Sequence, residues 1–427
     1  MVIKKLIFLF VFLLFFINKD LQSSQILDYE TELFINELIN EIKVANKIDK
    51  KLRFKILSDH NINAFVDQNN IIYITSGLIE NCDDYIALLS VIAHEIGHID
   101  KNHVKNRIVN INKSKNISSF TNLSIIASSL ILKNTEILKG IAVSSGTLSE
   151  YNIKFNKDQE READYYSLMT LKKLNLYSES ITKLLLKIEK KSLERGFSKE
   201  KMKYSTHPYF EERIDIINYL NQNKGIKLDK SMNLKYKFIQ AKFIGYNENE
   251  VQINNLDNSL KVYANAILSA KKGNLKESLI NLNKLISLNK NNYFLIETKA
   301  DILFSYGYVK ESIKFYQKVL EKHPNNNYAQ IRVLENINLQ ELSKNDIENL
   351  FLDNLNLLKK YYNNKNLLLI YLKLSNFSNK KDWIEFLDYW LSKQDNQDII
   401  INNLYKFKQS NDIQLSNLVQ LIYNDYR

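Results

Sequence analysis

One five-residue segment, His94-Glu95-Ile96-Gly97-His98, has the residue types and spacing of a metal-dependent hydrolytic centre and lies inside an apolar run. On a helix, residues four apart share a face, so the two histidines can bind one metal ion. Glu95 lies about 100° further round such a helix. From there its carboxylate can take a proton from a water molecule at the metal, as a general base does. The pattern also arises by chance in helices, so other residues must support it.

A catalytic zinc ion needs three protein ligands and one open position, and the best third candidate is Glu160. This residue lies in a carboxylate-rich segment, 158–164, which predicts the start of a second helix. Asp164 follows four residues later on the same face, where it can hold a ligand imidazole by its ring N–H. The alternative is a solvated helix start whose negative charges suit the helix dipole. Because the histidine pair is present, we favour ligation by Glu160.

Other residues near the motif have simpler interpretations. Gly97 is a costly helix residue between the two histidines, which predicts that another element packs closely there. His103 lies five residues beyond His98, so it is a surface residue or a neighbour of a ligand rather than a ligand. His60 and His323 show no partner pattern, and we expect structural roles for them.

Composition narrows the class of protein. The chain has 427 residues, enough for two or three domains, and its nine glycines and two prolines predict a mainly helical fold. The formal net charge of +11 is consistent with affinity for nucleic acid or anionic membrane, but the basic residues form no dense cluster. We therefore favour a lysine-rich solvated surface and no nucleic-acid partner. The single cysteine, Cys82, excludes an internal disulfide and a cysteine-cluster metal site.

The N-terminal segment resembles a signal peptide. Residues 1–5 carry two lysines, residues 6–17 are apolar without interruption, and residues 18–20 are polar. Twelve apolar residues are too few to span a bilayer comfortably. We predict a signal peptide over 1–24, export from the cytoplasm and a periplasmic location. The cleavage site lacks the usual small-residue pattern, so an uncleaved membrane anchor is the alternative.

The segments around the motif predict a helix, a small sheet and a second helix. Apolar spacing predicts an amphipathic helix over 28–47. Two β-like runs follow at 54–57 and 71–75, with a turn at 67–70. Residues 82–84 can cap the motif helix, which we expect to run to about residue 110.

Residues 118–149 contain only three charged side chains and are rich in Ile, Leu, Ala and Ser. A buried helical pair or a lid over the active site would explain this composition. A patch that contacts a membrane is the alternative, and we favour the core or lid.

The C-terminal third contains an internal repeat of 34 residues, the period of tetratricopeptide helix–turn–helix units. Gly273 aligns with Gly307, and Pro324 lies where such repeats often place a proline, although the usual early aromatic residue is missing. Two repeats are clear, 259–292 and 293–326. Because such units need stacked neighbours, we expect degenerate units or caps at 231–250 and after residue 328. The domain boundaries predicted from this pattern are 25–225 and 226–427.

Several motifs together resemble the HtpX-like zinc metallopeptidases, a group that includes the CAAX prenyl endopeptidases. The similar segments are Asn63-Ala64-Phe65, Ser76-Gly77-Leu78, the His94–His98 motif and Glu160-x-x-Ala163-Asp164. The predicted signal peptide, Ser205-Thr206-His207-Pro208 and the repeats resemble the periplasmic BepA-like branch, also called YfgC-like. The resemblance covers roughly residues 30–325.

This resemblance implies a mostly helical α+β fold, a gluzincin-type zinc metallopeptidase domain with a small β-sheet, followed by an α-helical tetratricopeptide-repeat solenoid. It implies one Zn²⁺ per chain held by His94, His98 and Glu160, with Glu95 as catalytic base and Asp164 as a supporting carboxylate. In that branch the His-Pro segment lies close to the metal, so His207 is a candidate to occupy or gate the fourth zinc position. The family's usual turn before the second strand is replaced here by Asp67-Gln68-Asn69. The shape of the substrate-side edge therefore stays open.

The function that follows is a zinc-dependent endopeptidase acting on misfolded or stalled outer-membrane proteins. Its repeats would recruit substrate or the outer-membrane assembly machinery. The main alternative is a non-proteolytic periplasmic chaperone or adaptor with a closed zinc site. A second alternative is a membrane-anchored protease with residues 118–143 in the bilayer, or in peripheral contact with it.

Overall fold

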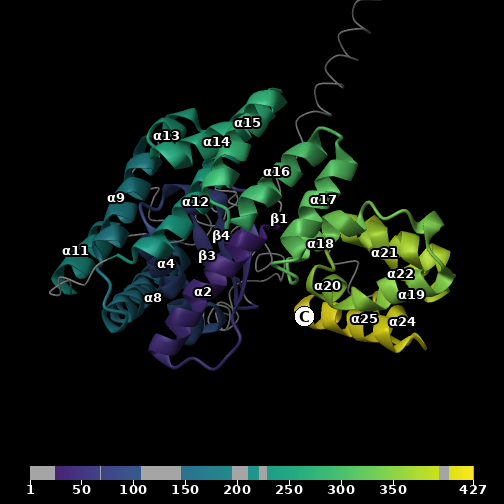
Figure 1. Ribbon diagram of the computed structural model, residues 1–427. Coiled ribbons are helices and arrows are strands. Elements are labelled where there is room, and N and C mark those ends of the chain that lie inside the picture. The colour runs from purple at the N-terminus through teal and green to yellow at the C-terminus, as the bar shows by residue number, and fades with distance from the viewer. Residues whose placement is uncertain are drawn as a thin grey trace, which may run out of the picture. The chain divides into compact units, whose positions relative to one another are not determined.

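The computed structural model describes residues 25–67, 69–106, 146–194, 210–220, 228–393 and 403–426 (Figure 1). The predictions for the signal peptide, for residues 118–145 and for His207 lie outside these residues. The chain divides into two compact units. The first comprises Leu33–Phe243 and the segment before Asp28, and the second comprises Asp28–Glu32 and Ile244–Arg427. Both are mostly helical, and the first contains a small sheet, which confirms the predicted fold class.

The sheet has four strands in the order β1-β2-β4-β3. The central strands β2 and β4 are parallel, and the two outer strands are antiparallel to their neighbours. Both predicted strands are confirmed. The strands β1 and β3 were not predicted, because two and three residues are too few to show an alternating pattern. The strands are β1 (Gln25–Ile26), β2 (Arg53–Leu57), β3 (Ala64–Val66) and β4 (Ile71–Thr75).

The predicted turn between β3 and β4 is present and is organised by Asp67. Its Oδ1 accepts hydrogen bonds from the backbone N–H groups of Asn69 and Ile71, both at 2.9 Å. Asn70 has a φ of +57°, a left-handed conformation that asparagine tolerates better than most residues. An aspartate and asparagine turn thus connects β4 to the edge strand β3.

Among the residues that the structure describes, seven helices belong wholly or mainly to the first unit. The sheet and the buried faces of α2, α4 and α12 contribute to one hydrophobic core. The sequence predicts a degenerate unit or a cap at 231–250, and within this range Tyr236 and Ile239 of α12 lie in this core. These helices are α2 (Tyr29–Asn46), α3 (Ser76–Asn81), α4 (Tyr85–Asp100), α8 (Gly146–Lys173), α9 (Glu179–Glu194), α11 (Phe210–Leu220) and α12 (Lys230–Tyr246).

The motif helix α4 is buried along almost its whole length, from Tyr85 to Ile99. The expectation that it runs to residue 110 is wrong, because it ends at Asp100. Asn102 adopts a φ of +54°, and such a left-handed residue turns the chain away from the helix axis. The backbone N–H of Lys101 still donates to the carbonyl of Gly97 at 3.0 Å, so the last turn is closed.

The start of α4 is capped by Asp84, as the sequence predicts. Its Oδ1 accepts the N–H of Ala87 at 3.0 Å, which satisfies one of the helix's first backbone donors. Its Oδ2 accepts the hydroxyls of Tyr177 at 2.9 Å and Ser180 at 2.6 Å. One carboxylate therefore joins the N-terminus of the motif helix to the region of α9.

Replacing this cap is expected to destabilise the protein. Asp84→Ala removes the cap and leaves buried hydroxyl groups with a lost acceptor, so the free energy of unfolding should fall by about 2–4 kcal/mol. Asp83→Ala is the matched control, because Asp83 pairs with Lys187 at the surface and such pairs contribute about 1 kcal/mol or less. Urea unfolding of both variants measures the difference. Equal losses would show that Asp84 does not have this role.

The described part of the second unit consists of helices, most of them joined by short turns (Figure 1). A shift of 34 residues moves the first residue of α15, Leu275, onto the first residue of α17, Val309. The turns before these helices contain Gly273 and Gly307, with φ of +86° and +82°, which explains why glycine recurs there. These helices are α13 (Glu250–Asn254), α14 (Asn258–Lys271), α15 (Leu275–Leu288), α16 (Tyr293–Ser305), α17 (Val309–Leu320), α18 (Asn327–Leu334), α19 (Lys344–Asp353), α20 (Leu355–Lys360), α21 (Lys365–Phe377), α22 (Lys381–Lys393), α24 (Tyr405–Lys408) and α25 (Ile413–Tyr426).

This helical region fits a repeat solenoid, and its assignment to tetratricopeptide units stays a prediction. In the part of the chain that the structure describes, none of the helices has the length and apolar character needed to cross a membrane.

Candidate metal centre

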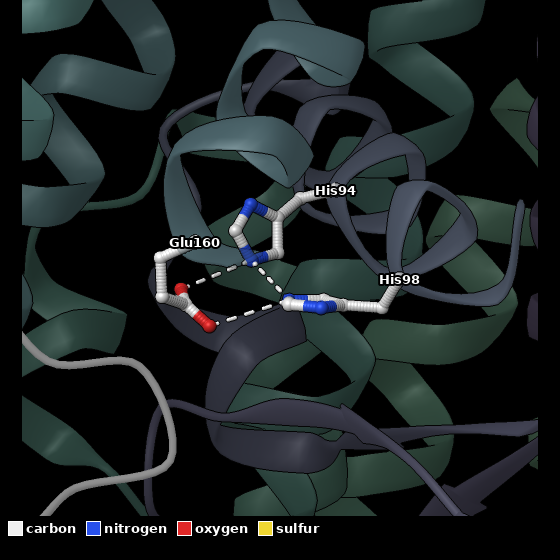
Figure 2. A group of neighbouring side chains, drawn as sticks. All are labelled: His94, His98 and Glu160. Atoms are coloured by element: carbon white, nitrogen blue, oxygen red, sulfur yellow. Dashed lines mark hydrogen bonds and ion pairs between the residues drawn. The ribbon is translucent and has the colours of Figure 1, made fainter. Parts of the chain in front are cut away.

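His94 and His98 lie one turn apart on α4 and point their rings toward the same space (Figure 2). Their Nε2 atoms are 3.0 Å apart, and both side chains are buried. The two rings face the same space because the residues are four apart on one helix. The N-terminal cap and the core contacts of this helix fix its position. The structure therefore brings the two histidines together as predicted.

Glu160 reaches the same space from α8, a second helix (Figure 2). Its Oε2 lies 3.3 Å from the Nε2 of His94, and its Oε1 lies 3.3 Å from the Nε2 of His98. The sequence places this residue at a helix start, whereas α8 begins at Gly146 and Glu160 lies well inside it. The helix-dipole explanation for its charge therefore does not apply, and its 2% exposure requires a specific partner.

These three side chains have the chemistry and the spacing of a zinc site. Ligand atoms bound to one tetrahedral zinc ion at about 2.0–2.1 Å are roughly 3.3 Å apart. The two nitrogen–oxygen distances in the cluster are 3.3 Å. Each residue offers one ligand atom, and these atoms lie within 4.8 Å of one another. Two imidazole nitrogens and a buried carboxylate thus fit the ion.

Asp164 lies one turn beyond Glu160 and contacts the other ring nitrogen of His94. Its Oδ1 is 2.9 Å from His94 Nδ1, so the carboxylate accepts the ring N–H, and Nε2 is the nitrogen that faces the cluster. Burial and the charge of Arg213 lower the pKa of His94, but hydrogen bonds to Asp164 and Glu160 outweigh them and raise it to about 9. A metal ion at Nε2 therefore has to displace a proton.

Arg213 of α11 is a site residue that sequence reasoning missed. Its Nε and one terminal nitrogen donate to the two oxygens of Asp164 at 2.8 and 2.7 Å, and its other terminal nitrogen lies 3.7 Å from Glu160. Burial raises the pKa of Asp164, but the Arg213 charge and the His94 contact reverse this and lower it below its usual value. The available signal in the sequence was an arginine four residues before an apolar residue, Ile217, on one helix face; both side chains are buried.

Glu95 follows His94 on α4 and is 1% exposed. Burial lowers the pKa of Arg213, but the nearby carboxylates outweigh burial and raise this pKa above its usual value. Asp164 is the main cause of the rise, and the negative charge of Glu95 adds to it. The structure thus places the candidate base on the helix of the two candidate ligand histidines, in the electrostatic field of the Arg213 guanidinium.

Gly97 marks the closest approach of α4 to α8, which confirms the predicted close packing. A Cβ atom at this position would lie 3.0 Å from the Cβ of Tyr166 and 3.2 Å from the Cα of Ala163. Only glycine lets the two helices approach this closely without a shift. Ala163 lies between Glu160 and Asp164 in the sequence, so the distance between the helices also sets the position of these carboxylates.

Gly97→Ala is therefore expected to move α8 by a few tenths of an ångström and lower zinc affinity by about tenfold. Competition with a chromophoric chelator measures the affinity, and thermal melting of the metal-free protein serves as the control. Without the close contact, the substitution would raise helix stability by about 0.5–1 kcal/mol. A higher melting temperature with unchanged zinc affinity would contradict the expectation.

Comparison with known proteins agrees with this geometry. Residues 30–221 match the model of peptidase family M48. The chain is 26% identical to the beta-barrel assembly-enhancing protease of Yersinia pestis over 268 residues, which cover 60% of this chain and 54% of the relative. It is 24% identical to the protein of that name from Escherichia coli strain K12 over 297 residues, 66% of this chain and 59% of the relative.

A putative beta-barrel assembly-enhancing protease of Vibrio cholerae is 24% identical over 219 residues, 49% of this chain and 44% of the relative. The chain thus spans about half the length of the curated relatives it matches. The matched family range contains both histidines, Glu160, Asp164 and Arg213. The predicted resemblance is confirmed, because residues 30–221 match peptidase family M48 and these relatives are named beta-barrel assembly-enhancing proteases.

Proposed function

We propose that this chain is a zinc-dependent endopeptidase, with His94, His98 and Glu160 as the zinc ligands. One observation carries the proposal. Two buried Nε2 atoms and both oxygens of a buried carboxylate converge from two helices, and a separate carboxylate, Asp164, holds the outer nitrogen of His94. Two ring nitrogens 3.0 Å apart need a cation between them, which is a proton in the metal-free protein and a metal ion in the loaded one.

When bound, the zinc ion supplies Lewis-acid polarisation and lowers the pKa of water. The residues of the chain do the rest. Glu95 accepts a proton from the attacking water on its carboxylate and returns it to the leaving amine, as a general base and then a general acid. Asp164 and Arg213 keep His94 in the tautomer that leaves Nε2 free.

The proposed substrates are misfolded or stalled outer-membrane proteins in the periplasm, and the C-terminal helices recruit these substrates or the assembly machinery. The relatives' name, beta-barrel assembly-enhancing protease, supports this proposal. The apolar segment at 6–17 supports export. A metallopeptidase domain at 25–225 and a repeat domain at 226–427 complete it. We further propose that His207 occupies or gates the fourth zinc position, so that His207→Ala would raise the cleavage of unfolded substrate.

Removal of the metal tests the proposal. A strong chelator is expected to abolish cleavage of unfolded casein, and stoichiometric zinc should restore it, because the metal supplies chemistry that no side chain here replaces. Matched addition of magnesium is the control, since a histidine-rich set prefers zinc. Full cleavage by metal-free protein would overturn the protease proposal. Zinc binding without any cleavage, together with suppression of aggregation, would favour the chaperone alternative.

A further inference from the structure

We infer that His103 and Glu162 form a relay that fixes the orientation and tautomer of the ligand His98. The inference rests on the proposed zinc site and assigns to two further residues a positioning role. His94 has such a partner in Asp164. The corresponding partner of His98 is a second histidine, which is itself held by a carboxylate.

The contacts form a continuous line away from the metal-binding atoms. His98 Nδ1 lies 2.9 Å from His103 Nδ1, and His103 Nε2 lies 2.9 Å from Glu162 Oε2. The two rings are nearly perpendicular, at 73°, with centroids 5.0 Å apart. His103 is 3% exposed, whereas the Glu162 side chain is 60% exposed. The relay therefore begins at a buried ligand and ends at solvent.

The hydrogen bonds of this line have one consistent direction. The Glu162 carboxylate only accepts, so His103 donates from Nε2. Neutral His103 then has a bare Nδ1, which accepts the Nδ1–H of His98. That leaves the Nε2 of His98 unprotonated, and this is the atom 3.3 Å from Glu160 and 3.0 Å from His94. Through His103, Glu162 thus sets the tautomer of His98 that a metal ion needs.

The contact between His98 and His103 is possible because α4 ends at Asp100. Asn102, with its φ of +54°, turns the chain so that a residue five positions after His98 faces it again. The backbone carbonyl of His103 accepts a hydrogen bond from the side-chain amide of Gln159 at 3.0 Å. Gln159 precedes Glu160 on α8 and is also buried. The same helix therefore supplies the third ligand, the anchor of His103 and the carboxylate that ends the relay.

The geometry argues against His103 as a zinc ligand. Its Nδ1 faces the Nδ1 of His98, which is the nitrogen on the side of the ring away from Glu160 and His94. Its Nε2 is directed to Glu162. Both ring nitrogens are therefore committed to other partners, and the role left for His103 is to orient His98.

A conservative variant separates positioning from packing. The amide oxygen of His103→Gln can still accept from His98 Nδ1, whereas His103→Leu fills the space without an acceptor. We expect zinc affinity, measured by chelator competition, to fall about 10–100-fold in His103→Leu. In His103→Gln it should stay within about threefold of wild type. His60→Leu, at an exposed histidine, is the control.

Two further readouts make the outcomes distinct. In zinc-loaded protein the Nδ1–H proton of His98 should give a slowly exchanging downfield NMR signal, lost in His103→Leu and kept in His103→Gln. Thermal melting of the metal-free variants reports folding alone. If wild type binds zinc and His103→Leu matches it in affinity and NMR signal, the relay is overturned while the protease proposal stands. If wild type itself binds no zinc, the proposed function fails first.

Discussion

Glu95→Gln is expected to lower peptide cleavage by about 10²–10⁴-fold while zinc content stays at the wild-type level. The amide cannot take a proton from the attacking water, yet it has nearly the same size and polarity as the carboxylate it replaces. Glu95 is buried on α4 and follows His94 in the sequence, so we expect its replacement to affect the chemistry and to leave the proposed ligands in place. Initial rates of casein cleavage and metal analysis of the same sample measure both effects.

Glu80→Gln is the matched control for this variant, because Glu80 is a buried glutamate of α3 in the same unit. It should cleave at the wild-type rate once folded. Cleavage by Glu95→Gln at the wild-type rate would show that the residue is not the base. Equal loss of zinc and of cleavage would mean that Glu95 acts through the fold or the ligands.

Arg213→Leu is expected to lower the free energy of unfolding of the metal-free protein by about 3–5 kcal/mol. The substitution leaves the buried carboxylate of Asp164 without its two-point partner and also removes the positive charge near Glu160. An uncompensated buried charge costs far more than a lost surface pair. Chemical denaturation after chelation measures the loss.

Arg161→Leu is the control, because Arg161 pairs with Asp158 at the surface of the same unit, and we expect a change of about 1 kcal/mol or less. The double variant Asp164→Asn/Arg213→Leu should be more stable than Arg213→Leu alone, since neither buried charge remains. If the free energy of unfolding falls by the same amount in Arg213→Leu and Arg161→Leu, the buried ion pair does not stabilise the protein more than a surface pair does.

The sequence alone identifies the parts of this site that lie on regular helices. Four-residue spacing predicts that His94 and His98 share a face and that Asp164 follows Glu160, and the structure places all four side chains in one cluster. A 34-residue shift likewise aligns Gly273 with Gly307, and the structure shows that both adopt a positive φ. Periodicity is informative here because each relation is local.

The contacts that the sequence does not reveal depend on chain reversals and on distant helices. Asn102 adopts a left-handed conformation that ends α4, and no local pattern predicts that His103 returns to His98. Arg213 is 49 positions from its partner Asp164. The true start of α8 at Gly146 is also hidden, because residues 146–157 lack the carboxylate cluster that suggested a helix start at 158.

The most direct test of the central claim is the zinc content of purified wild type, Glu95→Gln and Glu160→Ala. About one tightly bound zinc ion per chain is expected in wild type and in Glu95→Gln. Zinc should be largely lost from Glu160→Ala, because a two-histidine site lacks the third ligand that such centres need. Full zinc retention by Glu160→Ala, or a wild-type protein that binds no zinc, would contradict the account.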